Sequence, residues 1–290
     1  MNEEYRNYLL EGQNAGIRYG IGCPRTIQRG LIGSHLGNRS GSSLEFMDHR
    51  EYIPGDDLRR IDWNAFARSD KLSIKLYRDE VNPHLDIIID CSRSMALPDS
   101  KKVYATLALA AVFAQAATNS DYSFTAWKVC DICTKVVNGS DQTSLWQDIE
   151  FDGRISCDQS FRRQLPLFKP RGLRVLISDL LWLDRPHSTL SILADRASAV
   201  FIVQLLSQAD VEPPERGNVR LQDFETEQFK NIFIDALAQK KYRENLQAHQ
   251  YNWNRAGRGL GAVMTTVIAE RIVDQWKLDE LVVSEILKVL

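Results

Sequence analysis

The sequence lacks a long apolar run, a regular set of cysteines and a large net charge of either sign. Its five cysteines are odd in number and scattered, which argues against a disulfide framework. The 36 basic and 38 acidic residues nearly balance, so no electrostatic footprint points to nucleic acid or to an anionic membrane. The acidic start is not followed by an apolar segment, so no signal peptide is expected. These absences predict a cytoplasmic protein with no transmembrane segment and no nucleic-acid partner.

Two further patterns are missing. No Gly-x-x-x-x-Gly-Lys-Ser/Thr loop occurs, so the chain is not itself a P-loop ATPase. Cys130-x-x-Cys133 looks like half of a zinc site, but no second pair and no histidine at finger spacing follows it. We therefore interpret the two cysteines as small apolar residues near a turn between strands.

The composition and the hydrophobic pattern of the sequence change near residue 80. Residues 1–80 are punctuated by glycines and rich in serine and arginine, which is typical of loops and short strands. In residues 81–290, apolar strands alternate with helices, which predicts an α/β domain with a doubly wound, mostly parallel sheet. We expect buried strands at 85–90, 173–178, 199–206 and 261–268, helices at 101–118, 161–168, 189–197, 236–255 and 278–290, an antiparallel pair within 122–137, and a hairpin insertion near 211–235.

The densest motif of the first region is Arg-Glu-Tyr-Ile-Pro-Gly-Asp-Asp-Leu-Arg-Arg-Ile-Asp-Trp at 50–63. Its Pro-Gly pair predicts a turn, after which Asp56 or Asp57 caps a short helix. A catalytic pair of carboxylates is the alternative, which we disfavour because adjacent aspartates in such turns commonly cap. We expect Trp63 to be buried, so that Trp63→Ala destabilises the fold; unchanged stability would instead indicate a side chain available to a partner.

A candidate cation site follows the first buried strand. Asp90, Ser92 and Ser94 form Asp-x-Ser-x-Ser at the carboxyl end of that strand, where open α/β sheets bind ligands. Asp179 follows another buried strand, whose end can lie beside the first. Such hard oxygen donors suit Mg²⁺, or Mn²⁺, with open positions for water or a partner's carboxylate. The alternative is structural: Asp90 caps the next helical segment and the serines satisfy backbone groups of the loop.

This stretch resembles the von Willebrand factor A domain and its metal-ion-dependent adhesion site, whose pattern is Asp-x-Ser-x-Ser, a distant Thr and a distant Asp. Four residues match that pattern: Asp90, Ser92, Ser94 and Asp179. The threonine is not obvious. Ser156 is the nearest hydroxyl substitute at the expected place, and Thr143 is a poorer candidate. The resemblance implies that the four matching residues, with Ser156, hold the metal.

The segment from Gly30 through Met95 also closely resembles the MoxR-associated family called domain of unknown function 58. The resemblance rests on Arg-x-Tyr-x-Pro-Gly-Asp-Asp-x-Arg-x-Ile-Asp-Trp, a later Ala-Arg, and Asp-x-Ser-x-Ser-Met. Similar stretches recur at 177–180, 221–226 and 242–249. The family implies a MoxR-type AAA+ ATPase and other von Willebrand A-like proteins as partners, in chaperone-like maturation, metal insertion or stress functions. It implies no established enzymatic activity.

The favoured function is a non-catalytic protein-interaction module in which a partner's carboxylate completes the coordination of Mg²⁺. The histidines are scattered, and His84 falls at the wrong end of its strand, so no general base is expected at the site. One alternative is a Mg²⁺-dependent phosphohydrolase with Asp90 as nucleophile. Phosphatases of that kind place a general acid where this chain has Ser92, which cannot supply acid chemistry at neutral pH. A degenerate scaffold without metal is the third hypothesis.

Overall fold

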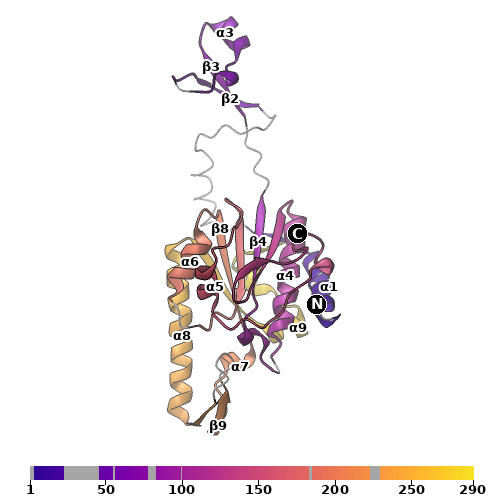
Figure 1. Cartoon of the computed structure of the whole chain (residues 1–290), viewed down its shortest axis with the longest axis vertical. Helices are drawn as coiled ribbons and strands as arrows, with labels where there is room; N and C mark the ends of the chain where they lie inside the picture. Colours follow the sequence, from indigo (N-terminus) through magenta and orange to yellow (C-terminus); the bar gives the residue numbers. More distant parts are fainter. Residues whose placement is uncertain are drawn as a thin grey trace. The chain divides into compact units, whose positions relative to one another are not determined.

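The computed structural model of the chain describes residues 3–22, 46–54, 56–77, 83–98, 100–182, 185–222 and 229–290 (Figure 1). Its contacts divide the chain into two compact units, Met1–Gln28 with Pro83–Leu290 and, separately, Arg29–Asn82. The sequence grouped residues 1–80 together, whereas helix α1 (Glu3–Gly16) packs along α4 (Lys102–Asn119) of the larger unit. None of the described helices has both the length and the apolarity needed to cross a membrane.

The larger unit is built on a six-stranded sheet with the order β11-β8-β7-β4-β5-β6. All neighbouring pairs are parallel except β5 and β6, which form an antiparallel hairpin. The strands are β4 (His84–Asp90), β5 (Ser123–Val129), β6 (Cys133–Lys135), β7 (Leu173–Ser178), β8 (Ala199–Leu206) and β11 (Ala262–Ile268). Every residue of β4, β7 and β8 is buried, as expected for apolar strands covered on both faces. The mixed α/β fold with a mostly parallel sheet is therefore confirmed.

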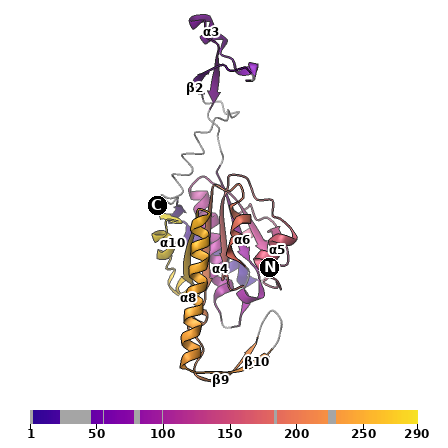
Figure 2. The same cartoon turned by 90° about the vertical axis from the view of Figure 1, so that its left-hand side faces the viewer.

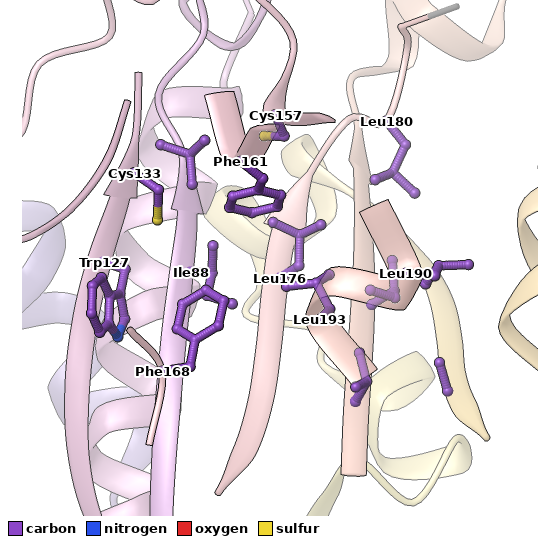
Figure 3. Close-up of a cluster of buried hydrophobic side chains, with 14 of the residues drawn as sticks. Ile88, Trp127, Cys133, Cys157, Phe161, Phe168, Leu176, Leu180, Leu190 and Leu193 are labelled. Atoms are coloured by element: carbon purple, nitrogen blue, oxygen red, sulfur yellow. The ribbon is translucent and has the colours of Figure 1, made fainter. Parts of the chain in front are cut away.

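Helices cover both faces of this sheet (Figures 1 and 2). On one face, the alanine-rich helix α4 packs against the strands and also contacts α1 and α9 (Ala269–Gln275). On the other face lie α5 (Cys157–Arg163), α6 (Pro186–Ala194) and α8 (Ala236–Gly259). Figure 3 shows how Phe161 of α5 and Leu190 of α6 meet Leu176 and Ile88 of the sheet in one apolar cluster.

An arm follows strand β8. It consists of the short helix α7 (Gln208–Val211), the antiparallel strands β9 (Gly217–Gln222) and β10 (Phe229–Ile234), and the first turns of α8. The hairpin lies beside the N-terminal end of α8 (Figure 2). The strand pair expected within 211–235 is therefore confirmed.

Two of the predicted helices differ from the structure, either in where they begin and end or in their secondary-structure type. The helix expected at 161–168 begins earlier and ends at Arg163, because Pro166 disfavours helical backbone at the residue before it. The helix expected at 278–290 is only α10 (Asp279–Val283). After Glu285, whose φ is 57°, the chain continues as β12 (Leu287–Val289), which pairs antiparallel with β1 (Tyr19–Ile21). The partner strand comes from the other end of the sequence, so local pattern could not indicate it.

The smaller unit pairs β2 (Phe46–Glu51) with β3 (Ser73–Tyr77) and carries the helices η1 (Leu58–Arg60) and α3 (Trp63–Ser69). Asp57 caps η1 by accepting a hydrogen bond from the backbone N–H of Arg59, which confirms the capping interpretation. Asp56 instead pairs with Arg50. Asp62 caps α3, a role that was not predicted from the sequence.

The expected burial of Trp63 is wrong. Its side chain is 62% exposed, although it contacts Phe66 edge to face. Among the described residues of this unit, the buried apolar side chains are those of Ile61 and Ile74, which face each other across an isolated antiparallel bridge. Trp63 begins α3 just after this bridge, and its ring lies outside the small core.

Candidate functional site at the ends of strands β4 and β7

The order in which the chain adds strands to the sheet reverses at β4. The chain passes from β4 to β5 and β6 on one side and then returns to β7 on the other. In open α/β sheets, ligands bind at the carboxyl ends of the strands where the order reverses in this way. Asp90 is the last residue of β4, and Asp179 directly follows β7. The two strands are paired up to Ile89 and Ile177, so both aspartates lie at this reversal, as the sequence predicted.

Asp90 is buried and hydrogen-bonded at both carboxylate oxygens. Its Oδ1 accepts a hydrogen bond from the backbone N–H of Ser92 at 2.9 Å, and its Oδ2 accepts one from the hydroxyl of Ser178 at 2.6 Å. The thiol of Cys157 also donates to this carboxylate. Burial, followed by repulsion from Asp179, raises the pKa of Asp90 to about 6, so the ionised form is costly without a cation nearby.

The structural alternative predicts that the two serines satisfy backbone groups of the loop. Ser92 stands at the N-cap of η2 (Arg93–Ala96), yet its side chain makes no capping hydrogen bond. The hydroxyls of Ser92 and Ser94 instead share a hydrogen bond, with their Oγ atoms 3.0 Å apart. Ser92 is nearly buried and Ser94 is partly exposed. The pair therefore presents two neighbouring hydroxyl oxygens beside the carboxylate of Asp90.

A buried lysine, which was not predicted from the sequence, completes the site. Lys102, the first residue of α4, has no exposed surface. Its Nζ lies 3.0 Å from Oδ2 of Asp179 and 3.2 Å from Oδ2 of Asp210 on α7. Burial by itself lowers the pKa of Lys102, but the two carboxylates outweigh burial and the net pKa is raised. Lys102 is thus a fixed cation. Only the fold brings it to Asp210, far away in the sequence.

The turn after Asp179 is held in an uncommon backbone conformation. Leu180 is buried at a φ of 59°, in the left-handed region that non-glycine residues rarely adopt. The backbone N–H of Leu181 donates to Oδ1 of Asp179 at 3.1 Å. The carbonyl of Leu180 accepts a hydrogen bond of 2.7 Å from Nε2 of His249 on α8. The contact with Leu181 holds Oδ1 of Asp179, while Oδ2 of the same carboxylate faces Lys102.

The two candidates for the missing threonine occupy different places. Ser156 is the N-cap of α5 and accepts a hydrogen bond from the backbone N–H of Gln159 at 3.3 Å. It precedes Cys157, whose thiol reaches Asp90, so Ser156 lies close to the site. Thr143 donates a 2.8 Å hydrogen bond to Oε1 of Gln13 on α1. That contact makes Thr143 part of the packing of α1.

His84 is the first residue of β4, and its Nδ1 pairs with the hydroxyl of Ser123 at 2.9 Å. It therefore stands at the opposite end of the strand from Asp90, as expected. Across the described ranges, no three His, Cys, Asp or Glu side chains form a group able to hold a metal ion.

Comparison with known proteins places the chain in a family. Two uncharacterized proteins, from Mycobacterium bovis and Mycobacterium tuberculosis, are each 26% identical over 263 residues, which cover 83% of this chain and 80% of theirs. Among solved structures, the conserved hypothetical protein BatB from Bacteroides thetaiotaomicron has a TM-score of 0.37 at 10% identity, over 70% of this chain and 98% of that one. The family described as "Protein of unknown function DUF58" matches residues 48–142 and 160–252. Since this match covers more than half of the chain, the protein belongs to the DUF58 family.

Proposed function

We propose that the protein is a non-catalytic interaction module of the von Willebrand factor A type. In this proposal Mg²⁺, or Mn²⁺, binds at Asp90, Ser92, Ser94 and Asp179, and a carboxylate of a partner completes its coordination. The observation that carries the proposal is the 3.0 Å separation of the two serine Oγ atoms. Adjacent ligand atoms around octahedral Mg²⁺, with bonds of about 2.1 Å, lie about 3.0 Å apart. The hydroxyls are therefore already spaced as neighbouring ligands.

The charges around the hydroxyls support a divalent cation. Asp90, Asp179 and Asp210 carry three negative charges when ionised, against one positive charge on Lys102. One divalent cation would neutralise the remainder. Mg²⁺ is usually held by few carboxylates and keeps several waters, so Asp90 and Asp179 can act through bound water while their present hydrogen bonds persist. The hydroxyl oxygen of Ser156 would bind the cation only if it also keeps its capping hydrogen bond.

The arm offers contacts for a partner close to this site. Asp210 of α7 reaches Lys102, and the hairpin follows α7 directly. The arm carries large exposed apolar side chains, with Phe229 55%, Phe233 67% and Leu237 72% exposed. A partner that supplies a carboxylate to the cation could bury these side chains at the same time. The partner proposed here is a MoxR-type AAA+ ATPase, or another von Willebrand A-like protein, as the sequence resemblance implies.

A metal-independent scaffold is the second candidate, and the contact between Lys102 and Asp179 favours it. The ammonium already neutralises one of the two strand-end carboxylates. A phosphohydrolase is less well supported, because Asp90 is only 1% exposed and both of its oxygens accept hydrogen bonds from the protein. A nucleophile needs a free approach to the substrate.

Calorimetric titration of Mg²⁺ and Mn²⁺ into the metal-stripped full chain tests the proposal. Wild type should bind one divalent cation, and Ser94→Ala should weaken binding at least tenfold. Ser100→Ala is the matched control, because its hydroxyl bonds the backbone carbonyl of Leu97 in the same stretch of chain. If wild type binds neither cation, or if both variants bind like wild type, the metal site is refuted and the scaffold is favoured.

A further inference from the structure

A group of thiols lies beside the loop of Asp90. Of the four cysteines in the described part of the chain, Cys91, Cys133 and Cys157 are buried and Cys130 is partly exposed. Cys130 lines a polar pocket of about 460 Å³ together with Arg93, Lys128 and Glu150. A small polar molecule can therefore reach the sulfur of Cys130 from solvent.

Strand pairing places Cys91 next to Cys130. Strands β4 and β5 are parallel and in register up to Asp90 opposite Val129, so these cysteines are the next residues along both strands. The backbone N–H of Cys91 donates to the carbonyl of Val129 at 2.9 Å, which continues the pairing to that point. Neighbouring strands lie about 4.8 Å apart. That spacing falls within the range of about 4.4–6.8 Å between the Cα atoms of disulfide-bonded cysteines.

The thiols themselves interact. The thiol of Cys91 donates a hydrogen bond to the sulfur of Cys130. Gly153 lies against both residues, since a Cβ atom there would stand 3.0 Å from Cα of Cys130 and 3.1 Å from the carbonyl oxygen of Cys91. The segment around Gly153 thus covers Cys91 and leaves Cys130 as the accessible member of the pair.

We propose that Cys91 and Cys130 are a modification site that hydrogen peroxide oxidises to a disulfide. The sulfur of Cys130 attacks one peroxide oxygen, the O–O bond breaks, and the products are Cys130 sulfenic acid and water. The sulfur of Cys91 then attacks the sulfur of Cys130, the S–O bond breaks, and the Cys91 proton leaves with the hydroxyl as a second water. In total, two thiols lose two electrons and one peroxide molecule becomes two waters.

The surroundings of the two thiols determine which of them attacks peroxide first. The hydrogen bond from Cys91 lowers the pKa of Cys130, against the opposing effect of burial. Cys91 is fully buried, whereas Cys130 is partly exposed and lines the pocket. Cys130 is therefore the thiol that peroxide reaches first. This chemistry needs no metal and does not depend on the proposed function, although Cys91 stands between two of the proposed ligands.

Peroxide titration of the reduced full chain tests the inference, in a Cys23→Ser background that removes the cysteine outside the described residues. One equivalent of peroxide should remove two free thiols and lower the mass of the chain by about 2 Da. Peptide mapping should find Cys91 joined to Cys130, and dithiothreitol should restore both thiols. Unchanged thiol counts, a disulfide between other cysteines, or a disulfide between two chains would overturn the proposal.

Variants assign the roles within the pair. Cys91→Ser should stop at Cys130 sulfenic acid, seen as a gain of about 16 Da that dimedone traps. Cys130→Ser should form no intramolecular disulfide. Cys133→Ser, a buried cysteine of the same hairpin, is the matched control and should oxidise like the Cys23→Ser background. Trapping of a sulfenic acid on Cys91 in Cys130→Ser at the rate seen for Cys130 would refute Cys130 as the attacking thiol.

Discussion

The ammonium nitrogen of Lys102 lies 3.0 Å from Oδ2 of Asp179, and neither side chain is more than 1% exposed. Asp210 approaches the same nitrogen at 3.2 Å. A buried ion pair adds little net stability by itself, but removal of one partner leaves an uncompensated charge in the interior. Lys102 therefore keeps two carboxylates stable at the candidate site whether or not a metal binds.

Lys102→Met should lower the free energy of unfolding by about 3–5 kcal/mol, because Asp179 and Asp210 then remain buried without their cation. Lys101→Met is the matched control. Lys101 pairs with Asp274 at an exposed position, so its loss should cost at most about 1 kcal/mol. Urea unfolding of both variants gives the two values. Equal losses would show that the buried charges at this site are screened by solvent.

The pKa of Asp90 predicts how stability depends on pH. The pKa is about 6 in the folded chain, against about 3.9 in an unfolded one. Between these values the folded state holds a proton that the unfolded state releases, so the contribution of Asp90 falls as pH rises through this window and stays low above pH 6. Asp90→Asn removes this charge and should be more stable than wild type at pH 7.5, by up to about 3 kcal/mol.

Urea unfolding of Asp90→Asn and wild type at pH 4 and pH 7.5, without divalent cations, measures this effect. Other titrating groups cancel in the difference between the two proteins. The stability advantage of the variant should grow from pH 4 to pH 7.5. An advantage that is equal at the two pH values would contradict a raised pKa for Asp90. The same variant should lose Mg²⁺ binding if the proposed function holds.

Gly12→Ala should destabilise the packing of α1 on α4. A Cβ atom at this position would stand 2.2 Å from the carbonyl oxygen of Ala108, so the two helices must move apart. The expected loss is about 1–3 kcal/mol, in spite of the higher helix propensity of alanine. Gly259→Ala, at the end of α8 with no atom within 4 Å, is the control and should be neutral or stabilising. Thermal unfolding of the two variants should give changes in Tm, relative to wild type, that have opposite signs or clearly different sizes.

Trp63→Ala should change the stability of the chain by no more than about 0.5 kcal/mol, because most of the indole is already in contact with solvent. Ile74→Ala, which removes a buried side chain from the same unit, should cost about 2–5 kcal/mol. Denaturant unfolding followed by circular dichroism compares the two variants. A large loss for Trp63→Ala would show that the indole is covered in solution.

The sequence predicted the parts of the site that follow from short-range pattern. Fully apolar strands that end in Asp90 and Asp179 indicate parallel strands whose carboxyl ends carry the candidate site, and the structure brings those ends together. It could not predict Lys102, because a lysine at the start of an alanine-rich helix looks like an ordinary surface residue. The burial of Lys102 depends on Asp210, which meets it only after β7 and β8 are in place. The exposure of Trp63 could not be predicted either, because it also depends on the tertiary structure. An apolar residue does not reveal whether its unit has a core large enough to cover it.

The pairing of β1 with β12 has a consequence for how the chain folds as it is synthesised. Helix α1 can dock only after α4 has been made, and β1 gains its partner only when the last strand is complete. The unit of Arg29–Asn82, whose strands pair within a short stretch, can fold well before either event. Contacts between residues far apart in sequence slow folding, so the larger unit should reach its native state later than the smaller one.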